Sequence, residues 1–117
     1  MEFRERDAAN EVWLSNIFEL AIARKAPGLC LFIHANPLGN SGESGWKSGF
    51  IRFLTQLREL TITYGEPVLL VHGDSHVFRL DKPLKRIGTA QDNIENFTRL
   101  EVFGARKMHA VRVDVFP

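Results

Sequence analysis

The stretch "EPVLLVHGDSHVFRL", residues 66–80, decides the fold of this chain. Its apolar run, residues 68–71, does not alternate with polar residues, and a short run of this kind between turn residues predicts a strand buried on both faces. The run ends abruptly in "HGDSH", residues 72–76, whose side chains are of the types that bind metals or form turns. The stretch therefore ends either in a metal site at the tip of a buried strand or in a polar turn that contains two histidines.

A second apolar run lies upstream. "GLCLFIH", residues 28–34, also lacks alternation and also ends in a histidine. Two amphipathic segments, 8–25 and 47–63, flank this run and predict helices, each followed by a helix-stopping glycine. The order helix, strand, helix, strand predicts parallel strands joined by a crossover helix. The apolar positions expected to face the core are Trp13, Ile17 and Leu20, flanked by Leu14, Phe18 and Ala21, in the first helix, and Phe50, Phe53, Leu54, Leu57 and Leu60 in the second.

The pattern changes downstream of "HGDSH". "VFRL", residues 77–80, is a short strand candidate, and residues 81–95 have the composition of a loop. "NFTRLEVFG", residues 96–104, and "MHAVRVDVFP", residues 108–117, alternate apolar and polar side chains, as half-buried antiparallel strands do, and predict a hairpin. We therefore expect one α/β domain over residues 1–117, in which two helices alternate with two buried strands and antiparallel strands follow.

The composition is that of an ordinary globular domain, since the 117 residues are 44% hydrophobic and 25% charged. The net charge of +1 gives no electrostatic case for binding nucleic acid or an anionic membrane surface. No run of 18 apolar residues and no signal-peptide pattern occurs, so the default expectation is a cytoplasmic chain, which lapses if the chain is part of a longer exported protein. The single cysteine, Cys30, lies in an apolar run, where we expect a buried, inert thiol.

Both predicted strands end in a histidine, His34 and His72. Ligands collect outside the carboxyl ends of parallel strands, so His34 lies close to the 72–76 turn if the two strands are neighbours. The turn adds the carboxylate of Asp74, and Gly73 would let the backbone turn tightly. Imidazole and carboxylate ligands suit Zn, Mn or Fe. The alternative is structural: each histidine bonds a carbonyl group at its strand end, and Asp74 caps a turn.

The stretch "VLLVHGDSH", together with a preceding strand that ends in His34, resembles the last two signature blocks of the calcineurin-like metallophosphoesterases. Those blocks are a lone histidine after one strand and Gly-His-(Ser/Thr)-His after the next. The segments "RDAANEVWL", "HANP", "HGDSHVFRLDKPL" and "NFTRLEVFG" are similar to one bacterial branch of this superfamily and together span nearly the whole chain. The resemblance implies a metallophosphoesterase-like α/β sandwich, of which this chain is the C-terminal portion.

The resemblance also implies roles for single residues. His34 resembles the lone histidine that binds the second metal of a dinuclear pair, and Asp74 stands where another histidine binds that same metal. His76 resembles the histidine that binds the first metal. His72 lies one residue outside the pattern, so we expect it to support the site rather than to bind metal. Two further residues are expected beside the ligands, in supporting or substrate-side positions: Gly73 and Asn36.

Several polar residues near the predicted site leave two interpretations open. Asn36 either orients a ligand or forms an Asx turn. Arg79 and Lys82 either contact phosphate or form structural pairs, for instance with Asp81. The loop "GNSGESGWKS", residues 39–48, has the position of a phosphate-binding loop, but its spacing departs from the Walker pattern and flexibility explains its glycines equally well.

The chain lacks the earlier blocks of the family, Asp-x-His, Gly-Asp-x-x-Asp and Gly-Asn-His-(Asp/Glu), which supply most ligands of the first metal. The resemblance thus implies a fragment of a hydrolase that acts on small phosphate esters and depends on Mn, Fe or Zn. The fragment alone would be an incomplete catalyst, and its catalytic residues are unknown. A missing N-terminal half or self-association would have to complete its site. The alternative is a non-catalytic α/β module for binding or self-association, which keeps the histidines as remnants and holds no metal.

Overall fold

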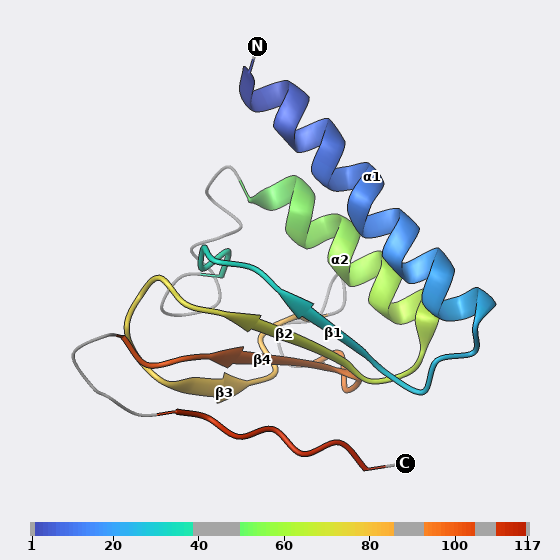
Figure 1. Ribbon diagram of the computed structural model, residues 1–117. Coiled ribbons are helices and arrows are strands. Elements are labelled where there is room, and N and C mark those ends of the chain that lie inside the picture. The colour runs from blue at the N-terminus through green and yellow to red at the C-terminus, as the bar shows by residue number, and fades with distance from the viewer. Residues whose placement is uncertain (1, 39–49, 86–92, 105–109, 117) are drawn as a thin grey trace.

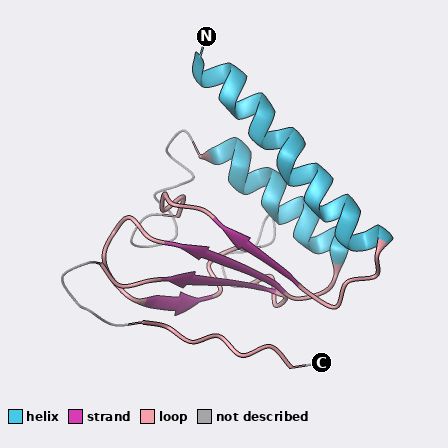
Figure 2. Cartoon of the chain, in the orientation of Figure 1, coloured by secondary structure: helices cyan, strands magenta, loops and turns pink. Residues whose placement is uncertain are grey.

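The computed structural model describes residues 2–38, 50–85, 93–104 and 110–116, without the side chains of residues 2–7 (Figure 1). Both helices lie on one face of the sheet (Figure 2). The described residues thus form a small mixed α/β domain with two helices and a four-stranded sheet. In chain order, the elements are α1 (Glu2–Ala23), β1 (Leu29–Phe32), α2 (Ile51–Tyr64), β2 (Val68–His72), β3 (Arg79–Asp81) and β4 (Phe97–Glu101).

The strands are ordered β1-β2-β4-β3 in the sheet. The strands β1, β2 and β4 run parallel, and β3 is antiparallel to β4. The connection between the parallel neighbours β1 and β2 contains α2, which confirms the predicted crossover helix. The antiparallel strands expected after β2 are present only in part, because β4 is parallel to β2.

The predicted hairpin between residues 96–104 and 108–117 is wrong. Residues 110–116 form no strand, and residues 105–109 lie outside the described part of the chain. Both edges of β4 are paired elsewhere, one with β2 and the other with β3. Alternation shows that a stretch fits a half-buried sheet, but it does not show which strand the stretch pairs with.

The helix α1 packs on the sheet along one narrow line of side chains. Leu14, Phe18 and Ala21, spaced four and three residues apart, are buried. The sequence predicts Trp13 and Leu20 in the centre of this stripe, but both are exposed. Since α1 contacts α2 and the shared core on its inner side, the outer part of its wide apolar stripe stays in solvent.

The helix α2 buries Leu54, Leu57 and Thr61. It ends at Gly65, whose left-handed φ of 77° lets its N–H donate to the Thr61 carbonyl O at 3.1 Å. This geometry confirms the predicted stop. Among the residues that the structure describes, no helix combines the length and the apolar character that crossing a membrane requires.

The helices cover only one face of the sheet. On the other face, Cys30 is exposed and Phe32 is 71% exposed. The prediction that β1 is buried on both faces, with a buried thiol, is therefore wrong. An apolar run without alternation indicates two apolar faces, but a face is buried only where another layer covers it. The buried core lies between the helices and the sheet and comprises Leu14, Phe18, Leu31, Leu38, Leu54, Leu57, Val68, Leu70, Leu84, Ile94 and Phe97.

Candidate functional site

The carboxyl ends of β1 and β2 meet at one edge of the sheet, as the sequence predicts. The register places Phe32 beside Val71. Beyond the strands, the Gly73 N–H donates to the His34 carbonyl O at 3.1 Å, so the two segments stay side by side. His34 and the 72–76 turn are therefore neighbours.

The turn after β2 contains two residues in the left-handed region, Asp74 at φ 83° and His76 at φ 63°. Asp and His enter this region more readily than most residues with a Cβ, but such a position costs on the order of 1 kcal/mol. Gly73, the residue predicted to allow the tight turn, has no positive φ, and a Cβ there would lie 3.9 Å from its nearest neighbours. The strain thus falls on the two predicted ligands, and other groups must hold the turn.

Asn36 is one of those groups. Its Oδ1 accepts the Leu38 N–H at 3.0 Å, which is the Asx turn that the sequence allows. Its Nδ2 donates to Ser75 Oγ at 2.9 Å, and its backbone N–H donates to Asp74 Oδ2 at 3.3 Å. Asn36 therefore links the segment after β1 to the turn after β2 by side chain and backbone together.

Glu101, at the end of β4, also holds this turn in place. Its side chain is completely buried. One carboxylate oxygen accepts the Ser75 N–H at 3.2 Å, and the other accepts Arg79 Nη1 at 3.2 Å. The backbone adds a bond from the Val102 N–H to the His72 carbonyl O at 3.0 Å. A buried carboxylate needs such partners, and here they connect the turn to the sheet.

Gly104 lies directly against His76. A Cβ on this glycine would lie 2.5 Å from His76 Cβ and 2.6 Å from His76 Cγ, far inside van der Waals contact. Only glycine allows so close an approach of the backbone to the imidazole. The segment after β4 therefore helps to set the position of His76.

The three predicted ligands, His34, Asp74 and His76, are all exposed. The backbone brings their segments together at the edge. Within the described residues, however, no group of three or more His, Cys, Asp or Glu side chains is placed so that it could hold a metal ion. As placed, these side chains therefore do not fit a metal as a complete ligand set.

His72 has a different environment from the other histidines near the edge. It is buried, with Nδ1 at 2.9 Å from the Gly73 carbonyl O and Nε2 at 3.5 Å from Arg99 Nη1. A hydrogen on Nδ1 and a lone pair on Nε2 suit these two neighbours. Both ring nitrogens thus face protein groups, which fits a supporting position rather than an open ligand.

Arg99 carries the second buried charge at this end of the sheet. Its Nε and Nη2 donate to Oδ1 and Oδ2 of Asp81, each at 2.6 Å. This is the bidentate geometry that makes guanidinium–carboxylate pairs strong. The pair ties β4 to the edge strand β3 and keeps Arg99 beside His72.

The buried roles of Arg99 and Glu101 are absent from the sequence-based predictions, although the chain carries a signal for them. "RLD" in β3 and "RLE" in β4 bring opposite charges together when they run antiparallel. The observed register pairs Arg79 with Glu101 and Asp81 with Arg99. Cross-strand pairs of opposite charge stabilise antiparallel strands, so this match could have indicated the pairing of β3 with β4.

Arg79 and Lys82, the two cations that follow the turn, both have protein partners. Arg79 pairs with Glu101, and Lys82 Nζ donates to the Glu95 carbonyl O and to Thr98 Oγ1. Their contacts match the structural interpretation rather than the one in which they contact phosphate.

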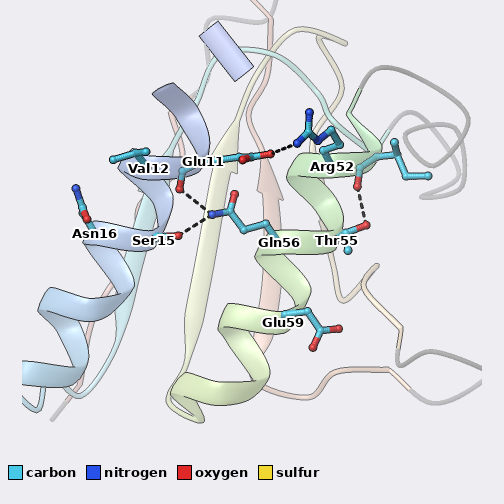
Figure 3. A pocket seen from close by; sticks show the side chains of 9 residues that line it. Glu11, Val12, Ser15, Asn16, Arg52, Thr55, Gln56 and Glu59 are labelled. Carbon is cyan, nitrogen blue, oxygen red and sulfur yellow. Dashed lines mark hydrogen bonds and ion pairs between the residues drawn. The ribbon is translucent and has the colours of Figure 1, made fainter. Parts of the chain in front are cut away.

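A groove of about 590 Å³ lies between α1 and α2, apart from the predicted ligands (Figure 3). Gln56 spans it, since its Nε2 donates to the Glu11 carbonyl O at 2.7 Å and to Ser15 Oγ at 2.9 Å. An ion pair of 3.0 Å joins Arg52 to Glu11. These polar groups connect the two helices. The loop considered as an alternative phosphate site, residues 39–48, lies outside the described residues.

Comparison with known proteins adds no relative. Neither protein-family models, nor curated proteins, nor solved structures gave a match to this chain. The metallophosphoesterase-like sandwich and the metal-ligand roles therefore stay predictions, which depend on the sequence motifs and on the geometry of the carboxyl edge.

Proposed function

We propose that this chain contributes the last ligand-bearing segments of a metal-dependent phosphoesterase site, with His34, Asp74 and His76 as the ligands. The observation that carries the proposal is the hydrogen bond from the Gly73 N–H to the His34 carbonyl O, because it joins the segment after β1 to the turn after β2. Ligands at the carboxyl ends of neighbouring parallel strands are the common arrangement in open α/β sheets.

The chemistry of the three side chains supports a divalent metal. Two imidazoles and one carboxylate suit Mn, Fe or Zn, and the carboxylate of Asp74 shifts the preference toward the harder ions. All three side chains are exposed, so none is needed in the core. The left-handed backbone at Asp74 and His76 is also typical of positions kept for a function, since strain persists where the surrounding structure enforces it.

The site needs further ligands. Because the described side chains do not form a complete set, the remaining ligands have to come from other residues of this chain, from a second copy or from another polypeptide. For that reason we assign no catalytic residue and no reaction step to the chain alone. Its proposed part is to hold metal at one side of a site for a small phosphate ester.

Titration of the metal-free chain with Mn²⁺ by calorimetry tests this proposal. We expect saturable binding that His34→Ala and His76→Ala each weaken at least about tenfold, as for loss of a group at a metal centre. Glu59→Ala is the matched control, because Glu59 is an exposed acidic residue on α2 and should not affect binding. Saturable binding that neither histidine variant weakens, or that the control weakens equally, would rule the proposal out.

A second candidate is the non-catalytic module for binding or self-association. The open face of the sheet favours it, because Phe32 and Leu80 are exposed there or at its rim. The same titration separates the two candidates, since a module that keeps its histidines only as remnants should show no dependence of Mn²⁺ binding on His34 and His76.

A further inference from the structure

Residues 110–116 lie on the side of the sheet away from the helices (Figure 1). Val111, Val113 and Val115 from this segment line an apolar groove of about 400 Å³ under the open face. A stretch with β-branched side chains at every second position thus lies along this face. The remaining side chains that line the groove come from β1, β2, β4 and the residue after β4: Cys30, Phe32, Leu69, Val71, Leu100 and Val102.

The backbone groups of residues 110–116 that the structure describes are not paired with a strand of the sheet. In the described part of the chain, no backbone hydrogen bond connects residues 110–116 to the sheet, and the segment forms no strand. Val115 remains 82% exposed in spite of the groove beside it. A strand-like segment with unpaired N–H and C=O groups is a template for pairing with another strand.

Charged side chains alternate with the valines of the segment. Arg112 and Asp114 form an ion pair of 3.0 Å, with side chains 86% and 51% exposed. The segment therefore reads Val-Arg-Val-Asp-Val from residue 111, with apolar side chains toward the sheet and charged side chains among the other positions.

The same chain already uses this charge pattern to pair two strands. Arg-Leu-Asp in β3 runs antiparallel to Arg-Leu-Glu in β4, and the register sets Arg79 against Glu101 and Asp81 against Arg99. Both charge pairs are made, at 3.2 Å and 2.6 Å. Arg112-Val113-Asp114 has the same order of a cation, an apolar residue and an acid.

Two copies of this Arg-apolar-acid order complement each other when they run antiparallel, because the arginine of each copy then lies opposite the acid of the other. A twofold axis through Val113 sets Arg112 of one copy opposite Asp114 of the partner subunit. The same axis sets Val113 against its own counterpart and Val111 against Val115 of the partner subunit. All five cross-strand pairs are then favourable, with apolar pairs on one side and opposite charges on the other.

We propose that residues 111–115 form an antiparallel strand pair with the same residues of a second copy of this chain. In such a pair the valines of both copies lie on one face of the ribbon and the charged side chains on the other. The proposal gives the second candidate function its surface and its partner, and it uses none of the predicted metal ligands.

Charge reversal tests the register. Sedimentation velocity over a range of concentrations measures the dimer dissociation constant of the wild type, of Arg112→Asp, of Asp114→Arg and of the double variant. Each single reversal places like charges opposite one another at two positions in the dimer. We therefore expect the dimer dissociation constant to rise at least about tenfold. The double variant restores both pairs and should return to within about threefold of wild type.

The control is the same reversal at another exposed ion pair, Glu11→Arg with Arg52→Glu, which joins α1 to α2 and should leave the dissociation constant unchanged. A wild-type chain that stays monomeric at every concentration would overturn the proposal. So would dimers insensitive to the single reversals, or a double variant as weak as either single one. Mn²⁺ titration of the same variants separates the two proposals, because the reversals should leave metal binding unchanged.

Discussion

At the carboxyl edge of the sheet, one set of polar side chains is exposed and another is buried. The exposed set is His34, Asp74 and His76, of which Asp74 and His76 have a left-handed backbone. The buried set is His72, Arg99 and Glu101, whose polar atoms meet protein groups. Polar residues close together at this edge thus differ in environment: the buried set connects the turn and the strands, and the exposed set faces solvent.

Burial of charge at this edge has a stability cost that only complete pairing offsets. A buried charge without a partner is far more unfavourable than a buried pair, so removal of one partner costs more than the pair contributes. The exposed set carries no buried charge. Substitutions should therefore separate the two sets, with large effects on unfolding in the buried set and effects on ligand binding in the exposed one.

The largest effect is expected for Arg99→Met. This change removes the bidentate partner of Asp81 and the neighbour of His72. Since Asp81 is 44% exposed and can be rehydrated, we expect the free energy of unfolding to fall by about 3 kcal/mol, at the lower end for a broken buried pair. Urea denaturation followed by circular dichroism measures it.

Arg112→Met is the matched control for that prediction. It also removes an arginine from an ion pair with an aspartate, but both side chains are exposed. At protein concentrations where the chain is monomeric, the expected change in the free energy of unfolding is within about 0.5 kcal/mol. Equal losses for the two variants would contradict the distinction between buried and exposed charges.

A smaller effect on unfolding is expected for Gly104→Ala. The added Cβ would meet His76 Cβ at 2.5 Å, so the turn has to shift, at a cost of about 1 kcal/mol. Mn²⁺ affinity should fall about tenfold because His76 moves. Gly28→Ala is the control, since its Cβ would lie 3.4 Å from the Pro67 carbonyl O, and no loss of affinity is expected. Unchanged Mn²⁺ affinity in Gly104→Ala would show that Mn²⁺ binding does not depend on the position of His76.

The smallest effect concerns Asp74→Gly. Glycine adopts the left-handed φ of 83° without strain, so the free energy of unfolding should rise by about 0.5 kcal/mol, after loss of the contact with the Asn36 N–H. Mn²⁺ affinity should fall at the same time, because a ligand is lost. Thermal unfolding and calorimetry together test this opposite pair of changes. A variant that loses stability and keeps its Mn²⁺ affinity would assign Asp74 to the turn alone.

Much of the fold could be predicted because its signals are local. The two helices, the order of β1, α2 and β2, the stop at Gly65 and the meeting of His34 with the turn all follow from periodicity, from a glycine or from the handed crossover. The place of β4 between β2 and β3 could not be predicted in this way, because alternation does not identify a pairing partner.

Burial was the main source of error. Cys30 and Phe32 belong to an apolar run, but the layer that would cover that side is not formed by the helices. Arg99 and Glu101 belong to an alternating stretch and would be expected in solvent, but the "RLD" and "RLE" match with β3 lets them be buried as pairs. In both regions, the exposure of a side chain depends on contacts between segments that are distant in the sequence. Composition and hydrophobic periodicity do not predict such contacts.

The most direct test of the central claim is a nuclear magnetic resonance titration of the ¹⁵N-labelled chain with substoichiometric Mn²⁺. A paramagnetic ion broadens the signals of nearby nuclei. We expect the amides of residues 34–36 and 73–77 to broaden first. We also expect His34→Ala and His76→Ala to remove this effect while the buried set stays folded. Broadening that begins instead at acidic residues on the helices, such as Glu11 and Glu59, or that persists in both variants, would contradict a metal-binding role for this edge.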